Sequence, residues 1–307
     1  MIELPKLLVS SVVRGSRQGD SHGGLYLVDL ARERYEQVID WNNCDINFEG
    51  RGADRGLRGI VFHDGRVYVA ASDELYVFNR AFEIVASYRN AYLKHCHEMC
   101  VFGPHLYLTS TGFDSVLRFD LTAGVFDGGI FVFPQGTQLG ARAFDPNQAG
   151  GPAAGIGFHF NNVFVDGRGI YLAGRKLGSL VRIGANQIVI AARLPLGTHN
   201  ARPFGNGILY NDTESDAVCF IADARQVSIP VPRYADADLL NLNLDESKLA
   251  RQAFGRGLRP LSDTLVAAGS SPTTISVYDL AAGRRIQSMN LTMDVRNAAH
   301  GMAMWPF

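Results

Sequence analysis

Short apolar runs alternate with polar turns along most of this chain. In the clearest copy, residues 97–120, a polar opening residue is followed by three apolar runs, with a tight turn and then a Gly, Asp and Ser turn between them. Runs of this length between turn signals are typical of β-strands joined by hairpins. A second copy at 58–72 carries His-Asp-Gly in its first turn, a composition that favours a short hairpin loop. The pattern predicts an all-β chain.

Counting the copies predicts the architecture. Five four-stranded copies fit between residues 58 and 290, whereas residues 300–307 match only the first strand of a copy. The N-terminal region supplies three strands, at 7–13, 24–30 and 35–41, and lacks a first one. Radial repetition of four-stranded units is the signature of a β-propeller. We therefore predict a six-bladed β-propeller, with four antiparallel strands in each blade.

The two ends of the chain are expected to form one blade together. If the C-terminal strand joins the three N-terminal strands, the ring closes without leaving unpaired strand edges. We thus expect a single domain over 1–307, whose sixth blade combines 1–41 with 300–307. Three longer stretches, each between the last strand of one blade and the first strand of the next, are expected to be loops over the central channel. These connectors are residues 42–57, 134–158 and 232–255.

The composition of the chain limits the kinds of binding partner that are expected. The net charge is −1 over 307 residues and the basic residues form no stripe, so a nucleic acid is not expected as a partner. No signal peptide and no membrane-length apolar run is recognisable, which predicts a cytoplasmic protein without a membrane partner. The four cysteines, Cys44, Cys96, Cys100 and Cys219, do not have a zinc-type spacing and are expected to be free thiols. The sequence leaves the oligomeric state open.

The candidate chemistry lies at the opening residue of each copy. Aligning five copies on their second strands places a polar residue at the same repeat position in each, and the C-terminal fragment adds His300 by similarity, since a polar residue precedes its apolar run too. The opening residues are Arg58, His97, Asn161, Asn200, Arg256 and His300. Since the innermost strand of a propeller blade begins at the mouth of the central channel, we expect these residues to form a polar ring there. A polar ring under long loops is typical of a small-molecule site.

Each residue type suggests a role in such a site. His97, His300 and Glu98 are the candidate acid/base groups, because imidazole and carboxylate exchange protons near neutral pH. Guanidinium groups suit the binding of negative charge and amides suit the orientation of a substrate or water. The candidate substrate-binding residues are Arg58, Asn161, Asn200, Arg256, His199 and His159. The alignment has an uncertainty of one residue, so His199 is an alternative to Asn200 in the ring.

A divalent metal ion is the candidate cofactor. Imidazole is the commonest transition-metal ligand, and His97, His300 and His199 are the candidate ligands. If the Asn and Glu side chains bound the ion instead, Ca²⁺ or Mg²⁺ would be favoured. No organic cofactor is expected, since the chain lacks a phosphate loop, and it also lacks a nucleophile elbow and the His-Glu-x-x-His pattern.

Each residue also has an explanation that involves no ligand. Asn and Arg at a strand start often only satisfy backbone groups of a turn. Arg58 and Arg256 have candidate ion-pair partners in Glu98, Asp54 and Asp263. A buried His is commonly a hydrogen-bonded core residue. The recurrence of polar residues at one repeat position favours a functional site over these explanations.

The repeat units at 59–72 and 115–120 resemble those of six-bladed propellers of the gluconolactonase, strictosidine synthase and streptogramin lyase group. The resemblance covers nearly the whole chain, and it extends to uncharacterised bacterial propeller proteins. It implies the propeller fold, a divalent metal or catalytic His and Glu at the channel mouth, and hydrolase or lyase chemistry on a small cyclic substrate. The ring departs from the Glu/Asn/Asn/Asp calcium set of the lactonases, which argues against calcium-dependent lactonase activity.

These observations favour an enzyme of hydrolase or lyase type, acting on a small polar or anionic substrate at the channel mouth. His acid/base or metal-assisted chemistry fits residues that include acid/base groups and no evident nucleophile. The alternative is a non-catalytic propeller that binds a ligand or another protein.

Overall fold

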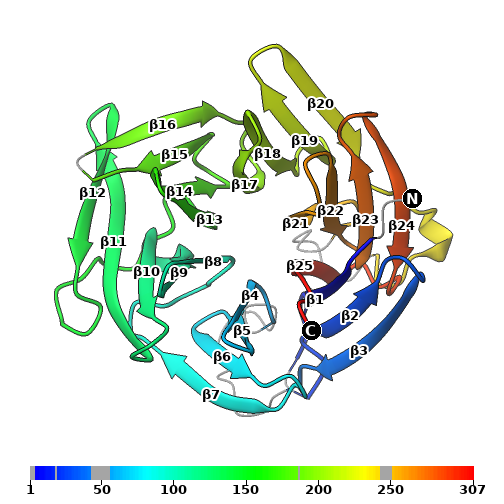
Figure 1. Cartoon of the computed structure of the whole chain (residues 1–307), viewed down its shortest axis with the longest axis horizontal. Helices are drawn as coiled ribbons and strands as arrows, with labels where there is room; N and C mark the ends of the chain where they lie inside the picture. The colour runs from blue at the N-terminus through cyan, green and yellow to red at the C-terminus, as the bar shows by residue number, and fades with distance from the viewer. Residues whose placement is uncertain (1–3, 18, 43–55, 186, 243–250) are drawn as a thin grey trace. The chain divides into compact units, whose positions relative to one another are not determined.

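The chain folds almost entirely into antiparallel β-sheets. The computed structural model describes residues 4–17, 19–42, 56–185, 187–242 and 251–307. In these ranges it contains strands β1 to β25 and two short 3-10 helices, at Thr111–Phe113 and Asp236–Asp238 (Figure 1). None of the described helices is long and apolar enough to cross a membrane.

Six sheets contain all of these strands. The first is built from β25 (Asn297–Met304), β1 (Lys6–Val13), β2 (Gly24–Asp29) and β3 (Arg34–Asp40). The second consists of β4 (Ile60–His63), β5 (Arg66–Ala71), β6 (Glu74–Phe78) and β7 (Ile84–Arg89). The third contains β8 (Met99–Phe102), β9 (His105–Ser110), β10 (Ser115–Asp120), β11 (Val125–Gln135) and β12 (Gln138–Phe144).

The remaining sheets each have four strands. One contains β13 (Phe160–Asp166), β14 (Gly169–Gly174), β15 (Ser179–Ile183) and β16 (Ile188–Arg193). Another contains β17 (Thr198–Phe204), β18 (Gly207–Asp212), β19 (Ala217–Ala222) and β20 (Arg225–Pro230). The last contains β21 (Arg256–Pro260), β22 (Leu265–Ser270), β23 (Thr274–Asp279) and β24 (Arg284–Asn290). The predicted fold class, a six-bladed β-propeller, is confirmed.

The first sheet joins the two ends of the chain as predicted. β25 pairs antiparallel with β1, with Leu7 opposite Met304 and Val9 opposite Met302. On its other side, β1 pairs with β2. The C-terminal strand therefore supplies the inner strand that the three N-terminal strands lack.

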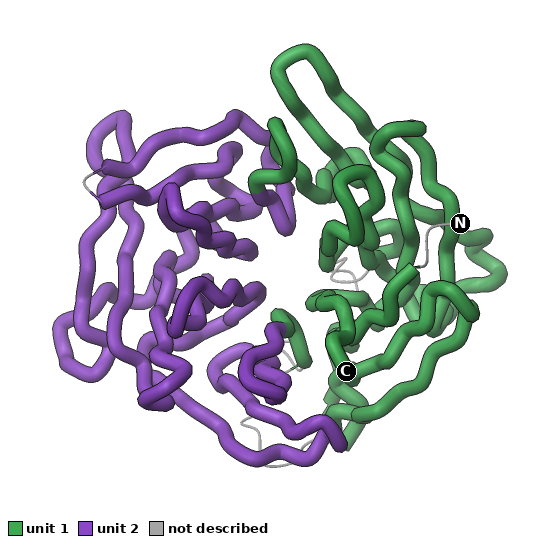
Figure 2. Tube along the Cα trace, in the orientation of Figure 1, with its two compact units in different colours: residues 1–60, 203–307 green, residues 61–202 purple. Residues whose placement is uncertain are grey.

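The chain divides into two compact units, shown in Figure 2. Unit 1 comprises residues 1–60 and 203–307, and unit 2 comprises residues 61–202.

Burial falls from the inner to the outer strands of a sheet. In the first sheet, seven of the eight residues of β1 are buried, whereas β3 is mostly exposed. Apolar side chains of neighbouring sheets fill the space between them: in unit 2, Leu75 and Val77 of β6 pack in one cluster with Leu106 and Leu108 of β9. Fully burying one such side chain contributes roughly 1.5–3 kcal/mol. A polar residue at the start of an inner strand is therefore drawn into a buried position.

The prediction of a loop connector over residues 134–158 is wrong for its first part. Residues 125–144 form a long hairpin, in which Phe131 of β11 lies opposite Arg142 of β12. Gly136, with φ of 60°, supplies the left-handed turn residue. Pro134 and the nearby glycines suggested a loop, but Pro134 lies beyond the end of the pairing with β10, where the hairpin has only two strands.

Most of the 42–57 connector and the middle of the 232–255 connector lie outside the described residues. The three described cysteines, Cys96, Cys100 and Cys219, are present as thiols, as expected.

Deletion of β25 should destabilise the protein severely. Removing residues 297–307 would uncover β1, whose Leu7 and Val9 are fully buried, and would cost roughly 3 kcal/mol or more through these two side chains. We expect a lower melting temperature by circular dichroism and aggregation in sedimentation experiments. Deletion of residues 306–307 alone, beyond the strand, should leave both unchanged. Equal behaviour of the two deletions would contradict the closing role of β25.

Candidate functional site

All six predicted opening residues are buried. None of Arg58, His97, Asn161, Asn200, Arg256 and His300 is more than 7% exposed. Each lies at or within a few residues of the start of an inner strand, as the repeat alignment predicts. Three belong to unit 1 (Arg58, Arg256 and His300) and three to unit 2 (His97, Asn161 and Asn200).

Backbone contacts bring the three opening residues of unit 1 together. Ser10 of β1 donates its hydroxyl to the Arg58 carbonyl oxygen at 2.5 Å and accepts from the Gly301 N–H at 2.7 Å. A Cβ on Gly301 would lie 2.0 Å from the Arg58 carbonyl oxygen, and one on Gly257 would lie 2.6 Å from that of His300. The segments carrying Arg58, His300 and Arg256 are thus in direct backbone contact in this order.

Irregular pairing accompanies these positions in both units. In unit 1, the register shifts between Arg256 and Leu258 of β21, and in β25 it shifts opposite Ser10 of β1. In unit 2, it shifts between Phe160 and Asn162 of β13. A β-bulge redirects the side chain at the extra residue, and bulges occur preferentially next to active sites. Asn161 is such an extra residue.

Replacing Gly301 by Ala should destabilise unit 1. The added methyl group would overlap the Arg58 backbone, and overpacking of this kind costs about 1–3 kcal/mol. Chemical denaturation should show the loss as a lower unfolding midpoint. Gly167, which has open space around it and no positive φ, provides the matched control as Gly167→Ala. An unchanged midpoint for Gly301→Ala would mean that the backbones are not in contact.

In unit 2, the ring of His97 is fixed by its Nδ1 atom. Nδ1 lies 2.7 Å from the His95 carbonyl oxygen and 3.0 Å from the Thr111 hydroxyl oxygen. A carbonyl oxygen only accepts, so Nδ1 carries the proton and donates it. The Thr111 hydroxyl donates in turn to the Phe160 carbonyl oxygen. In the neutral ring, the lone pair therefore resides on Nε2, the tautomer required of a general base or a metal ligand.

His199 repeats the arrangement of His97. Its Nδ1 atom lies 2.8 Å from the Gly197 carbonyl oxygen, again two residues earlier, which assigns the same tautomer. The strand pairing allows the two blades to be compared. In each, one residue of the second strand pairs with the first residue of the third strand: Ser110 in one blade and Asp212 in the other. His97 lies thirteen positions before Ser110, and His199 lies thirteen positions before Asp212. The structural equivalent of His97 is therefore His199, the alternative that the sequence left open, and Asn200 follows it.

Asn200 and Asn161 hold neighbouring groups in place. The Asn200 amide donates to Glu98 Oε1 at 2.9 Å, and the Asn161 amide donates to the Thr198 carbonyl oxygen at 2.9 Å. Asn200 adopts φ of 55°, a left-handed conformation that asparagine tolerates better than most residues. The carboxylate of half-buried Glu98 thus accepts a hydrogen bond from an uncharged donor.

His159 completes the group in unit 2. Its ring meets that of His97 edge to face, with centroids 5.3 Å apart. Asp114 holds the segment before it: its carboxylate accepts the backbone N–H groups of Gly157, Phe158 and His159 at 2.5, 3.0 and 3.3 Å. Burial raises the pKa of Asp114, and these N–H groups act in the opposite direction.

Sequence reasoning missed Thr111 and Asp114. Thr111 belongs to the 3-10 turn after β9 and Asp114 ends it with φ of 45°. The available signal was the Gly-Phe-Asp-Ser turn, which is equally typical of a hairpin with no further role. Their contacts with residues some 45 positions away depend on the packing of neighbouring sheets.

Replacing Asp114 by Asn should loosen the segment before His159. Asparagine tolerates the positive φ but offers one acceptor oxygen in place of two, so at least one backbone bond of roughly 1.4 kcal/mol is lost. Hydrogen exchange of the Gly157–His159 amides should accelerate on the order of ten-fold. Asp120→Asn, a change of the same chemistry in the same sheet, should leave these amides unaffected. Unchanged protection in Asp114→Asn would show that the carboxylate does not anchor the segment.

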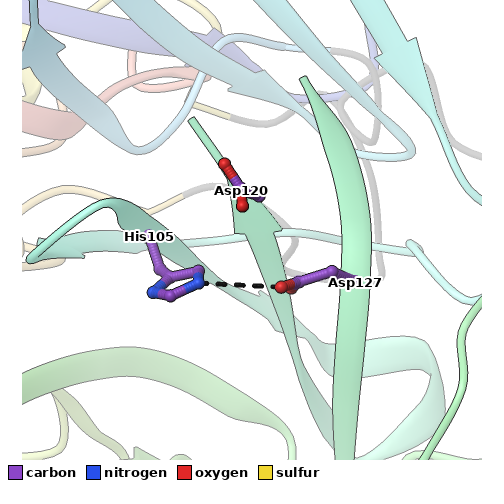
Figure 3. A group of neighbouring side chains, drawn as sticks. All are labelled: His105, Asp120 and Asp127. Carbon is purple, nitrogen blue, oxygen red and sulfur yellow. Dashed lines mark ion pairs between the residues drawn. The ribbon is translucent and has the colours of Figure 1, made fainter. Parts of the chain in front are cut away.

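Another cluster of possible metal ligands lies elsewhere in unit 2. Within the described ranges, one group of three His, Cys, Asp or Glu side chains has ligand atoms within 4.8 Å of one another: His105, Asp120 and Asp127 (Figure 3). Arg118 binds both carboxylate oxygens of Asp127, at 2.9 and 3.0 Å, and His105 Nε2 lies 3.6 Å from one of them.

Asp120 in that group accepts the Ala123 and Thr122 N–H groups, which lower its pKa. Its carboxylate thus holds the following turn, while Asp127 forms an ion pair with Arg118. The metal centre expected from His97, His300 and His199 stays a prediction.

Comparison with known proteins identifies the fold and no family. No family model matches the chain, and no curated protein matches it. Among solved structures, the chain is similar to a protein of a nidogen/laminin complex, at 11% identity with 97% of both chains covered and a TM-score of 0.59. It is also similar to a protein of unknown function from Bacteroides caccae, at 10% identity over 97% of this chain and 98% of that one, with a TM-score of 0.57.

A virginiamycin B lyase from Staphylococcus aureus aligns more loosely, at 11% identity over 78% of this chain and 71% of that one, with a TM-score of 0.48. At these identities, similarity to solved structures concerns the fold alone and says nothing of an activity. The β-propeller fold that the resemblance implies is confirmed by the six sheets of this chain.

Proposed function

We propose that this protein is an enzyme of hydrolase or lyase type that acts on a small polar or anionic substrate through acid/base chemistry at His97. The observation that carries the proposal is the fixed tautomer of His97. Donation of the Nδ1 proton to the His95 carbonyl places the lone pair on Nε2, and a ring that turned over would lose both this bond and the contact with Thr111. Preorganised acid/base groups of this kind contribute about 10²- to 10⁴-fold to a rate.

The neighbouring groups suit a proton transfer in two directions. In hydrolysis, Nε2 of His97 would take a proton from water as the water oxygen attacks, and the same proton would then pass to the leaving group. In an elimination, Nε2 would take the proton from carbon while the bond to the leaving group breaks. Glu98, held by Asn200, or His159, in contact with the His97 ring, would serve as the second acid/base group.

Unit 1 offers groups for the binding of negative charge. Arg58 and Arg256 lie on segments that are each in backbone contact with the segment of His300. A guanidinium keeps its charge at any physiological pH and binds carboxylate or phosphate through two parallel bonds. This supports the predicted role of the two arginines toward an anionic ligand.

The donor chemistry in unit 2 also fits a transition metal. His97 and His199 both donate Nδ1–H to a backbone carbonyl oxygen, which is how metal-binding histidines are commonly oriented. Their Nε2 atoms would hold the ion. A bound divalent ion would supply a water of lowered pKa.

One observation favours the non-catalytic alternative. The polar side chains of unit 2 are largely engaged with one another or with backbone, as in the bonds of Asn200 to Glu98 and of Asn161 to Thr198. Such internal pairing is also expected of a polar core that stabilises a ligand-binding or protein-binding propeller. Activity measurements separate the two functions.

Replacing His97 by Gln should abolish most of the activity. Turnover would first be sought in wild-type protein with a panel of lactones, p-nitrophenyl esters and substrates of β-elimination. For any substrate turned over, we expect kcat/KM to fall by about 10²- to 10⁴-fold in His97→Gln. His105→Gln changes the same residue type in the neighbouring strand β9 and should retain full activity.

Metal content of the same preparations, measured before and after dialysis against a chelator, tests the metal centre. Activity that survives in His97→Gln would overturn the role of His97, and the absence of any turnover across the panel would favour the non-catalytic alternative.

A further inference from the structure

Unit 1 contains a pocket separate from the opening residues. Its volume is about 570 Å³, within the range of roughly 300–1,000 Å³ typical of small-molecule sites. The walls come from β1 to β3, the loop between β1 and β2, and the segment that leads from β24 into β25. The lining residues are Val13, Asp20, Ser21, Tyr26, Tyr35, Gln37, Asp40, Leu291, Thr292, Asp294, Arg296 and Asn297. None of them belongs to the candidate site described above.

Internal hydrogen bonds hold the walls of this pocket. The Tyr35 hydroxyl donates to the Leu291 carbonyl oxygen at 3.1 Å, which ties β3 to the segment after β24. The ring of Tyr35 meets that of Tyr26 edge to face, with centroids 6.3 Å apart. Asn297 accepts from Thr273 at 2.9 Å. The pocket therefore has fixed aromatic and amide walls.

The charges of the lining are unbalanced. Asp294 is neutralised by Arg296, which binds it with two nitrogens at 3.1 and 2.7 Å. Asp20 and Asp40 make no ion pair with any residue in the described part of the chain. Asp40 accepts the Ser21 hydroxyl at 2.5 Å, and Asp20 accepts the Arg17 N–H at 3.1 Å. Two negative charges thus face a pocket whose one arginine is already paired.

The negative charges of Asp20 and Asp40 affect the pKa values of neighbouring basic residues. Burial lowers the pKa of His22, while Asp20 and Asp40 both act to raise it. The Asp294 side chain chiefly raises the pKa of Arg296, and the charge of Asp20 acts in the same direction. Both carboxylates line the same pocket, where a cationic ligand would meet them together.

We propose that this pocket binds a small organic cation bearing protonated amino groups. Ammonium groups donate hydrogen bonds to carboxylates such as those of Asp20 and Asp40, and charge-assisted bonds of this kind are stronger than neutral ones. Tyrosine faces attract cations when the ammonium lies within about 6 Å of the ring centroid. A ligand with two amino groups would balance both charges. The proposal is independent of the enzymatic function proposed above.

Binding of 1,4-diaminobutane to the whole purified chain tests the proposal, with 1,4-butanediol as the uncharged ligand of equal length. Calorimetry at low salt should show saturable binding of the diamine and none of the diol. The affinity should fall at least ten-fold in Asp20→Asn and in Asp40→Asn, and it should weaken as salt is raised. Asp263→Asn removes the same charge from an exposed position outside the pocket and should bind as wild type does.

Other outcomes would overturn the proposal. These are equal binding of diol and diamine, an equal loss of affinity in Asp263→Asn, binding of glucose in preference to the diamine, or no diamine binding at all. Melting curves of each variant show whether the fold is retained. If both pocket variants failed to fold, competition of the diamine with sodium chloride in the wild-type protein would still distinguish an electrostatic site from none.

Discussion

Close contact between the backbones of neighbouring inner strands is the constraint on which this structure depends. In unit 1 the contact is so close that Gly301 and Gly257 have no room for a side chain beside the carbonyl oxygens of Arg58 and His300. Ser10 bonds to two of these backbones at once. The residue that opens each inner strand is consequently removed from solvent, whatever its polarity.

Burial of polar residues in such positions has an energetic cost unless each finds a partner. The partners that unit 2 provides also determine its chemistry. The carbonyl of His95 assigns the Nδ1 proton of His97, that of Gly197 does the same for His199, and Asn200 anchors Glu98. The hydrogen bonds that offset the cost of burying these polar residues are therefore the same ones that would orient them for acid/base chemistry.

The pocket beside Tyr26 and Tyr35 differs from the opening residues in its exposure to solvent. Its carboxylates, those of Asp20 and Asp40, lie at exposed positions, and no residue in the described ranges forms an ion pair with them. Long-range attraction of a charged ligand, rather than a fixed tautomer, is what this part of unit 1 offers.

The sequence by itself determined the strands, their grouping into six blades and the union of the two chain ends, because apolar alternation and turn residues are local signals. It also located the opening residues to within one position. Only the tertiary structure decided between His199 and Asn200, since a shift of one residue reverses the side of a strand. The hairpin at 125–144 and the roles of Thr111 and Asp114 likewise required the packing of sheets. So did the pocket of Asp20 and Asp40, because its walls join residues more than 250 positions apart that no local pattern relates.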